Sequence, residues 1–322
     1  MRFIAAFAIG CFFLLAQSVA AAQAYPNKPV RIIVPFSPGG PTDIVARVVG
    51  QKLSEAFEKP VVIDNRAGAG GTLGASMVAK SAPDGYTLLL CSSGPTVVSP
   101  GLQDKMPYDT LRDFAPITLV LSFPYLLMVN PSFPAQSVKE LIAIAQAKPG
   151  QLNYGSAGTG TAGHLASELF RSMTKTNMVH VPYKGASVAA VDLISGQLQL
   201  LLEPAASALP RVRGGNVRAL GVSSMRRFSL LPDVPTINES GVPGYEASVW
   251  YGVCAPAGTP RDIVARLNRE IVKQVSSTET KERLVSLGAE LATNSPEQFR
   301  TFIGNELRKW SRVINETGVK AN

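Results

Sequence analysis

The chain has 322 residues, of which 46% are hydrophobic and 17% are charged, a balance typical of a globular protein and not of a disordered one. Its formal net charge is +8, but the basic residues are scattered and form no run of five or more. A nucleic-acid-binding protein would show a denser basic stripe, so we expect no nucleic-acid partner. The length suits two lobes better than a single core.

The first 24 residues have the composition of an export signal. Arg2 supplies a positive charge, residues 3–15 are apolar, and residues 22–24 read Ala-Gln-Ala, which fits an A-x-A cleavage site. The apolar stretch is too short for a membrane-spanning helix. We therefore expect a signal peptide over residues 1–24, cleavage near Ala24, and export to a bacterial periplasm or an extracellular setting.

Strand and helix signals alternate along the rest of the chain. Apolar runs predict strands at residues 30–36, 61–63, 87–91, 117–129, 152–155, 178–181, 198–202, 217–222 and 249–254. Periodicity and capping patterns predict helices over residues 42–57, after 65–74, from 137, between 155 and 178, after 185, from 259 and from 295. The first of these helices carries Ile44 on its apolar face. This alternation implies an α/β fold with mostly parallel sheets.

Two such blocks, separated by long strand-like crossings, predict two α/β lobes joined by a hinge. Residues 25–123 and 249–322 are expected to form the first lobe, and residues 124–248 the second. Ligands in folds of this kind bind at the carboxyl ends of the strands. The arrangement therefore predicts a cleft between the lobes that closes by hinge bending.

A turn rich in proline and glycine follows the first predicted strand. Phe36 ends the strand, and Ser37, Gly39 and Gly40 lead into the next helix. Free N–H groups and the positive end of the helix dipole favour an anion at such a place. We expect these residues to hold a carboxylate, with a plain strand-to-helix turn as the alternative. Asp43 would repel an anion, so we expect it to cap the helix or tie the loop.

A second turn of this kind follows the strand at 152–155. Ser156, Gly160 and Thr161 are expected to offer hydroxyl and N–H groups from the second lobe, with a simple helix N-cap as the alternative. Two such turns, far apart in sequence, suggest one small anion held from two sides. His164 is expected to pack and hydrogen bond beneath this loop and to take no part in catalysis.

Two further pairs of residues are candidates for the same cleft. Gly70 and Gly71 begin another helix, and Ser92 and Ser93 end a strand. Because both pairs follow strands of the first lobe, we expect them near the ligand, although each also fits an ordinary turn.

Three charged residues complete the set of candidates. Lys184 lies in a turn facing the cleft and either attracts an acid or is simply exposed. Asp192 is expected to bond an amino group or a loop amide. Glu203 either favours a ligand with a cationic group or pairs with a nearby arginine.

The cysteines and histidines give no sign of a cofactor or a catalytic centre. Cys91 and Cys254 remain after cleavage, and they form either a disulfide, if their strands are neighbours, or two buried thiols. The chain has two histidines and lacks the G-x-S-x-G, G-x-x-x-x-G-K-[ST] and H-E-x-x-H motifs. We therefore expect no metal, no cofactor and no enzymatic activity.

An ordered set of short motifs runs through almost the whole mature chain. They are Tyr25-Pro26, Val34-Pro35-Phe36 with Gly39-Gly40, Asn65-Arg66 with Gly68-Ala69-Gly70-Gly71, Pro83-Asp84-Gly85-Tyr86, Tyr154-Gly155-Ser156, Val181-Pro182-Tyr183-Lys184-Gly185, Leu231-Pro232-Asp233-Val234-Pro235 and Ala255-Pro256-Ala257-Gly258. In this order and spacing the chain resembles the periplasmic solute receptors of tripartite tricarboxylate transporters, the Bug family.

The resemblance implies a periplasmic-binding-protein fold of type II, the two-lobed Venus flytrap, which binds a ligand without converting it. The ligand of such a receptor is a small carboxylate: a dicarboxylic acid, an amino acid or an aromatic acid. Backbone amides, hydroxyls and water hold it without an arginine clamp, and the receptor hands it to a two-subunit inner-membrane permease. We expect the receptor to be a monomer. A sensor that presents the closed form to a signalling partner is the alternative.

The chain departs from the family pattern in two places near the expected ligand. The stretch 92–100 lacks the asparagine expected before its proline, and Leu202-Glu203-Pro204 replaces the more usual aromatic and small polar residues. The identity of the ligand therefore stays open at this stage.

Overall fold

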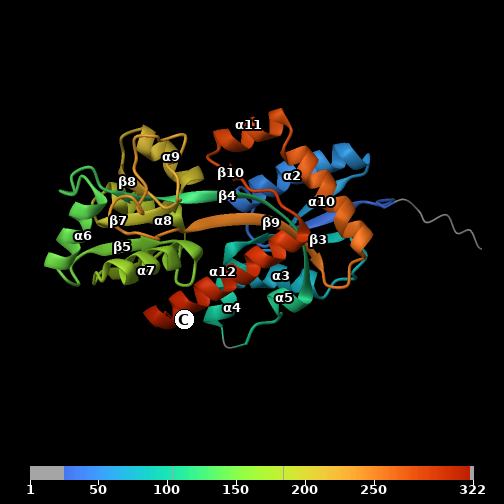
Figure 1. The fold of residues 1–322 in the computed structure, drawn as a ribbon, viewed down its shortest axis with the longest axis horizontal. Helices are drawn as coiled ribbons and strands as arrows, with labels where there is room; N and C mark the ends of the chain where they lie inside the picture. The colour runs from blue at the N-terminus through green and yellow to red at the C-terminus, as the bar shows by residue number, and fades with distance from the viewer. Residues whose placement is uncertain (1–24, 104, 184, 320–322) are drawn as a thin grey trace, which may run out of the picture.

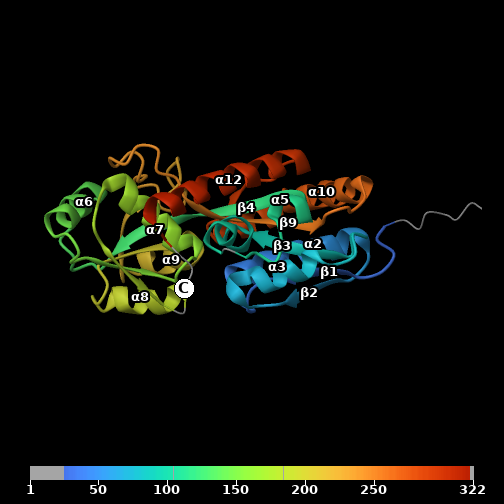
Figure 2. The ribbon, with the colours of Figure 1, turned by 90° about the horizontal axis from the view of Figure 1, so that it is seen from below.

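Two α/β lobes lie along the longest axis of the molecule (Figures 1 and 2). The structure is a computed structural model that describes residues 25–103, 105–183 and 185–319. The predicted signal peptide over residues 1–24 and the candidate Lys184 lie outside the described residues.

The first lobe is built on three parallel strands in the order β2 (Val61–Asn65), β1 (Val30–Val34) and β3 (Thr87–Ser92). The helices on this side are α2 (Pro41–Phe57), α3 (Thr72–Ala79), α4 (Ser99–Leu102), α5 (Thr110–Asp113), α10 (Arg261–Val275), α11 (Thr278–Ser286) and α12 (Pro296–Thr317), with the short turns η1 (Ala69–Gly71) and η2 (Gly94–Val98).

Helix α2 packs on this sheet through a stripe that includes Val45, Val49 and Leu53, all of them buried. Ile44 is 39% exposed, so its predicted place on the buried face is wrong. Successive helical residues are rotated by about 100°, which carries Ile44 off that stripe.

The second lobe repeats the parallel arrangement. Its strands are β5 (Asn153–Ser156), β6 (Val179–Pro182), β7 (Leu200–Pro204) and β8 (Arg218–Val222), and β5 pairs in parallel with both β6 and β7. Its helices are α6 (Val138–Ala147), α7 (Ala162–Thr174), α8 (Ala186–Ile194) and α9 (Ala205–Arg213). The predicted α/β class with two lobes is confirmed.

Two long strands connect the lobes. Strand β4 (Phe114–Val129) pairs with β9 (Ser248–Pro256) along residues 114–124 and with β7 along residues 125–129. The chain enters the second lobe on β4 and returns on β9, so these two strands run antiparallel to each other. β4 is also antiparallel to β7, β8 and β10 (Glu290–Leu291), and β9 to β3. The parallel pairing predicted for most of the sheet is therefore confined to the outer strands of each lobe.

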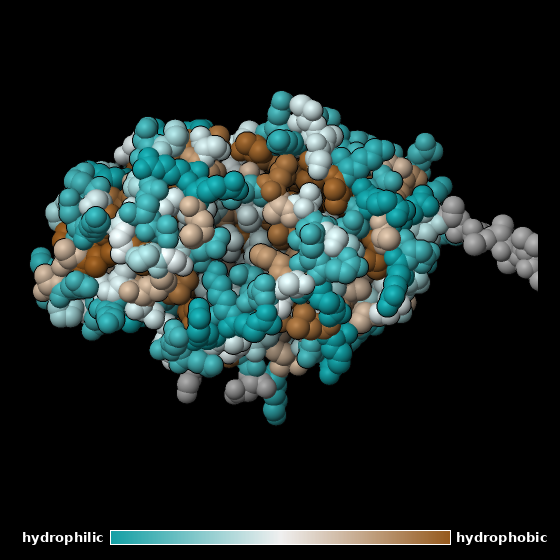
Figure 3. Space-filling view, in the orientation of Figure 1, coloured by the Kyte–Doolittle hydropathy of each residue, from teal (hydrophilic) through white to brown (hydrophobic). Residues whose placement is uncertain are grey.

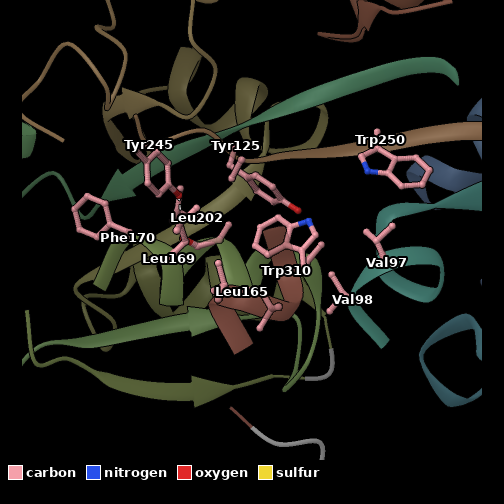
Figure 4. Packing of buried hydrophobic residues seen from close by; sticks show 14 of the residues in the cluster. Val97, Val98, Tyr125, Leu165, Leu169, Phe170, Leu202, Tyr245, Trp250 and Trp310 are labelled. Atoms are coloured by element: carbon pink, nitrogen blue, oxygen red, sulfur yellow. Dashed lines mark hydrogen bonds between the residues drawn. The ribbon is translucent and has the colours of Figure 1, made fainter. Parts of the chain in front are cut away.

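Helix α12 packs across the region where the lobes meet. Its predicted start is confirmed, since Ser295 and Gln298 form a reciprocal capping box. Figure 4 shows Trp310 of this helix between Leu165 of α7 and Val98 of η2, which come from different lobes. The side chains of these residues therefore form one core that the two lobes share.

The two cysteines are free and buried on the neighbouring strands β3 and β9. Cys91 lies opposite Gly252, and Cys254 lies opposite Leu89, so the thiols are two residues out of register. Burial and the neighbouring Cys254 raise the pKa of the Cys91 thiol well above its ordinary value, which keeps it protonated. Of the two alternatives for these cysteines, the structure shows the pair of buried thiols.

One face of the molecule is mainly hydrophilic. Figure 3 shows polar side chains over most of one face, with small hydrophobic groups between them. Among the helices that the structure describes, none combines the length and the apolar character needed to cross a membrane.

Candidate functional site

A cavity of about 710 Å³ is lined by residues from both lobes and from the connecting strands. Its wall is formed by Phe36, Pro41, Thr42, Ala69, Gly70, Ser92, Ser93, Gly94, Ser99, Leu102, Gln103, Tyr125, Ala157, Thr159, Gly160, Thr161, Ala162, Gly163, Ala186, Ser187, Leu202, Pro204, Ser207, Val249 and Tyr251. The first residues of α2 and of α7 belong to this cavity wall. The cavity therefore lies where the carboxyl ends of parallel strands lead into helices.

The start of α2 is left without a side-chain cap. Gly40 is the N-cap residue and has no side chain to accept a hydrogen bond, and Pro41 has no N–H group. Within the described residues, no acceptor is recorded for the amides of Thr42 and Asp43. Because Thr42 lines the cavity, this helix offers free donors and the positive end of its dipole at the wall.

The start of α7 is only partly capped. The hydroxyl of Thr161 accepts a hydrogen bond from the amide of His164, at 3.3 Å, while the amides of Ala162 and Gly163 have no acceptor recorded among the described residues. Both residues line the cavity. A second helix therefore presents unpaired N–H groups to the same space, from the opposite lobe.

Two of the glycine amides that the sequence suggested as donors, those of Gly39 and Gly160, are already used within the protein. The amide of Gly39 donates to Oδ2 of Asp43, at 3.0 Å, and the amide of Gly160 donates to Nδ1 of His164, at 3.1 Å. The amide of Gly158 donates to Oγ of Ser156, at 3.1 Å. These bonds fix the turns, and the free donors lie a few residues further on, at the first residues of each helix.

Asp43 ties the first-lobe turn together, as predicted. Its carboxylate accepts hydrogen bonds from Arg47 at 2.8 Å, from the side chain of Asn65 at 3.0 Å and from the amide of Gly39. Burial by itself raises the pKa of Asp43, but these hydrogen bonds outweigh it and hold the pKa below its ordinary value. The carboxylate is therefore ionised and fully engaged at neutral pH.

His164 anchors the second-lobe turn, as predicted. Its ring stacks on His180 with the centroids 3.8 Å apart, and Nε2 of His180 lies 2.6 Å from Oγ of Ser156. Burial, with smaller contributions from His180 and Arg171, lowers the pKa of His164 to about 3. Because Nδ1 accepts from Gly160, the neutral ring carries its proton on Nε2.

We expect this buried imidazole to make the protein less stable in acid. The unfolded histidine takes up a proton near its ordinary pKa of 6.5, while folded His164 does so only near 3. Its contribution to stability is therefore complete above pH 6.5 and is lost progressively as the pH falls towards 3. A His164→Gln variant lacks this contribution. Its free energy of unfolding, measured with urea at pH 7, 5 and 4, should therefore fall less between pH 7 and pH 4 than that of the wild type. Equal declines in both proteins would contradict the assignment.

Two buried serines lack hydrogen-bond partners. The hydroxyls of Ser92 and Ser93 are without any partner in the described protein, although the residues are only 3% and 0% exposed. Both line the cavity. Buried polar groups are nearly always satisfied, so these two hydroxyls indicate a place where a ligand or water supplies the missing bonds.

The structure places about half of the predicted site residues on the cavity wall. Those on the wall are Phe36, Gly70, Ser92, Ser93, Gly160 and Thr161, and those that do not line the cavity are Ser37, Gly39, Gly40, Gly71, Ser156 and Asp192. Ligand contact by any of them stays a prediction. Asp192 accepts a hydrogen bond from Tyr183, at 2.6 Å, and Glu203 pairs with Arg211, at 3.1 Å.

Sequence analysis missed several residues of the cavity wall. Thr42 and Gly163 could have been found, because they occupy the second position of the two helices already singled out. The sequence could not have identified the other three, Tyr125, Leu202 and Tyr251. An apolar strand has the same sequence pattern whether its side chains face a core or a cavity.

Comparison with known proteins identifies the fold and the family. The family model described as tripartite tricarboxylate transporter family receptor matches residues 45–319 of this chain. BugT of Bordetella pertussis is 41% identical over 315 residues, which cover 97% of each chain. Rpa4515 of R. palustris, solved with adipate, has a TM-score of 0.84 and 37% identity over 92% of this chain and 99% of that one. MatC of Rhodopseudomonas palustris, solved with malate, has a TM-score of 0.80 and 33% identity over 90% and 100% of the two chains.

These similarities decide between the classes of function. The matched proteins are periplasmic solute receptors, so the chain is a binding protein and not an enzyme, as predicted. The described residues contain no group of three or more histidine, cysteine or acidic side chains able to hold a metal ion. By its sequence and by its fold, the chain belongs to the receptor family of the tripartite tricarboxylate transporters.

Proposed function

We propose that this receptor binds a small carboxylate between its two lobes and delivers it to a two-subunit permease of the inner membrane. One observation supports this proposal above all. Two incompletely capped helix starts, at Thr42 and at Gly163, line one cavity together with two serine hydroxyls that have no hydrogen-bond partner among the described residues. Unpaired N–H groups at a helix start favour an anion. The adipate and malate bound by Rpa4515 and MatC support a carboxylate as that anion.

The lobes that close on the ligand are proposed to be residues 25–123 with 249–322, and residues 124–248. The pairing of β4 supports this division, because its partner changes from β9 to β7 between Pro124 and Tyr125. The protein is proposed to reach the periplasm by cleavage of the signal peptide near Ala24 and to act as a monomer. Sequencing the N-terminus of the exported protein tests the cleavage site, and light scattering tests the monomer.

Native mass spectrometry of freshly purified protein tests the ligand class. We expect an adduct whose mass matches a small organic acid and which disappears on denaturation, because flytrap receptors close over their ligand. A thermal-shift screen of small acids provides the second readout, since a ligand that binds only the native state raises the unfolding temperature. An absence of both an acid adduct and a shift with any small acid would contradict the proposal.

Sensing is the competing role, in which the closed form is presented to a signalling partner. Deletion of the receptor separates the two roles. Loss of uptake of the identified acid supports transport, whereas loss of gene induction with uptake intact supports sensing.

A further inference from the structure

The turn of the second lobe is held by a side chain that does not itself line the cavity. His180 is half-buried on β6, at the edge of the sheet, and its pairing partner on β5 is Tyr154. Residues two apart on a strand share a face, so Ser156 lies on the same face of β5 as Tyr154. The His180 ring stacks on Tyr154 with the centroids 5.0 Å apart, and its Nε2 lies 2.6 Å from Oγ of Ser156. Strand pairing therefore brings this imidazole to the start of the turn.

Hydrogen bonds lead from Ser156 along the turn. The Ser156 hydroxyl lies 3.1 Å from both the amide nitrogen and the carbonyl oxygen of Gly158. The Gly158 carbonyl accepts from the hydroxyl of Thr161, at 2.8 Å, and that hydroxyl accepts from the amide of His164. The contacts therefore run from the end of β5 to the first turn of α7.

The path of contacts returns to His180. The His164 ring accepts from the amide of Gly160 and stacks on the His180 ring, with the centroids 3.8 Å apart. His180 thus contacts Ser156 at the start of the turn and His164 at its end. Because the path is closed, loss of this one imidazole would loosen the turn at both ends.

His180 holds the turn by its shape and hydrogen bonding, since its ring is mainly neutral at pH 7. Burial has the largest influence and lowers the pKa of His180, Arg171 lowers it further, and Glu168 opposes them. A neutral imidazole bonds the Ser156 hydroxyl through one ring nitrogen and adds no charge near the proposed anion site.

On the basis of the proposed carboxylate-binding function, we propose that His180 is a positioning residue for the ligand. The turn that it holds leads into Ala162 and Gly163, which line the cavity and whose amides have no acceptor recorded among the described residues. A turn that is fixed before binding loses less conformational entropy when the ligand arrives. His180 therefore strengthens carboxylate binding from outside the cavity, through Ser156 and His164.

Three substitutions at His180 separate its two contacts. His180→Gln keeps a group able to bond Ser156 and loses the ring, His180→Phe keeps the ring and loses the hydrogen bond, and His180→Ala loses both. Affinity for the acid should fall by about tenfold or more in the alanine variant and by about two- to tenfold in the other two. Calorimetry at pH 7 on the full mature protein measures it, with whichever of malate, adipate, glutamate and benzoate the wild type binds most tightly.

The alanine variant decides the result if it folds, and the other two decide it if the alanine variant does not. Binding within twofold of the wild type, by the alanine variant or by both of the others, overturns the inference and leaves carboxylate binding intact. If the wild type binds none of the four acids and no acid recovered with the purified protein, the proposed function fails, and the inference fails with it.

A matched control separates positioning from a general loss of stability. Tyr245→Phe removes a buried hydroxyl of the same lobe, which donates to the Ala166 carbonyl at 2.9 Å. No hydrogen bond between Tyr245 and the turn is recorded among the described residues. This variant should have a lower unfolding temperature and an unchanged affinity. If affinity fell in step with the unfolding temperature in all of these variants, Tyr245→Phe included, His180 would have a structural role only.

Combining substitutions tests the route through Ser156. His180→Phe and Ser156→Ala remove the same hydrogen bond from its two sides, so the double variant should bind no more weakly than Ser156→Ala alone. If the two losses of affinity multiplied in the double variant, the residues would act independently, and the inference would be overturned.

Discussion

Replacing Gly40 with aspartate is expected to abolish carboxylate binding while the protein folds normally. Gly40 has a φ of −81°, which any residue adopts, and a Cβ added there would meet only the Ser37 carbonyl oxygen, at 3.8 Å. Aspartate is among the best N-cap residues, so its carboxylate would accept from the free amides of Thr42 and Asp43. It would thus occupy the donors proposed for the ligand and repel a second carboxylate.

The loss of one charge-assisted contact corresponds to about 1.5–3 kcal/mol, or about ten- to a hundredfold in affinity, and repulsion adds to it. Calorimetry measures the affinity, and thermal unfolding measures the fold, which should be as stable as the wild type or slightly more so. Gly40→Asn caps the helix without a charge and should have an intermediate affinity. Gly40→Ala leaves the donors free and should bind nearly as well as the wild type. If the aspartate variant still bound the carboxylate ligand tightly, the ligand would not be held by the amides at the start of α2.

The equivalent change in the second lobe is a poorer test. Gly160 has a φ of +76°, and a Cβ there would lie 2.8 Å from Cδ1 of Leu102. Any side chain at this position strains the loop that His164 holds, so lost binding would have two explanations.

Ser93→Ala is expected to stabilise the ligand-free protein and to weaken binding at the same time. The Ser93 hydroxyl is buried without a partner, and an unsatisfied buried polar group costs about 1–3 kcal/mol. Removing it therefore raises the stability of the empty receptor. A hydrogen bond to a charged ligand contributes about 1.5–3 kcal/mol, so affinity should fall by about ten- to a hundredfold.

These opposite signs distinguish a ligand contact from a structural serine. Urea unfolding of the ligand-free protein and calorimetry with the identified acid measure the two effects, and Ser92→Ala provides a parallel case. Ser167→Ala is the control, because the Ser167 hydroxyl already donates to the Gly163 carbonyl at 3.0 Å. If Ser93→Ala and Ser92→Ala both left affinity unchanged, the two hydroxyls would have no part in binding.

The sequence predicted the lobes and most of their elements because apolar runs and glycine-rich turns are local signals. The predicted start of α2, at residue 42, differs from the observed one by one residue, and the predicted start of α12 at Ser295 coincides with its observed N-cap. The antiparallel centre was not predicted. It depends on β4 and β9 crossing between the lobes in opposite directions, which is a property of the whole chain path.

The site was predictable in outline and not in detail. Glycine-rich turns at strand ends located the two halves of the cavity, one beside Pro41 and Thr42 and the other at Gly160. Which amides remain free depends on the side chains that fold back onto the turns, and Asp43 and His164 occupy the amides that looked most exposed. Such bonds arise from three-dimensional proximity, and spacing along the sequence does not reveal them.

The two indole rings give this receptor a built-in optical probe. Trp250 on β9 and Trp310 on α12 are the only tryptophans in the chain, and both donate to Oε2 of Glu306, at 3.3 and 3.0 Å. Both rings are fully buried, in the shared core beside the crossing strands. A rotation of one lobe against the other would change the surroundings of both emitters together, so the intrinsic fluorescence of the unlabelled protein reports the state of the hinge.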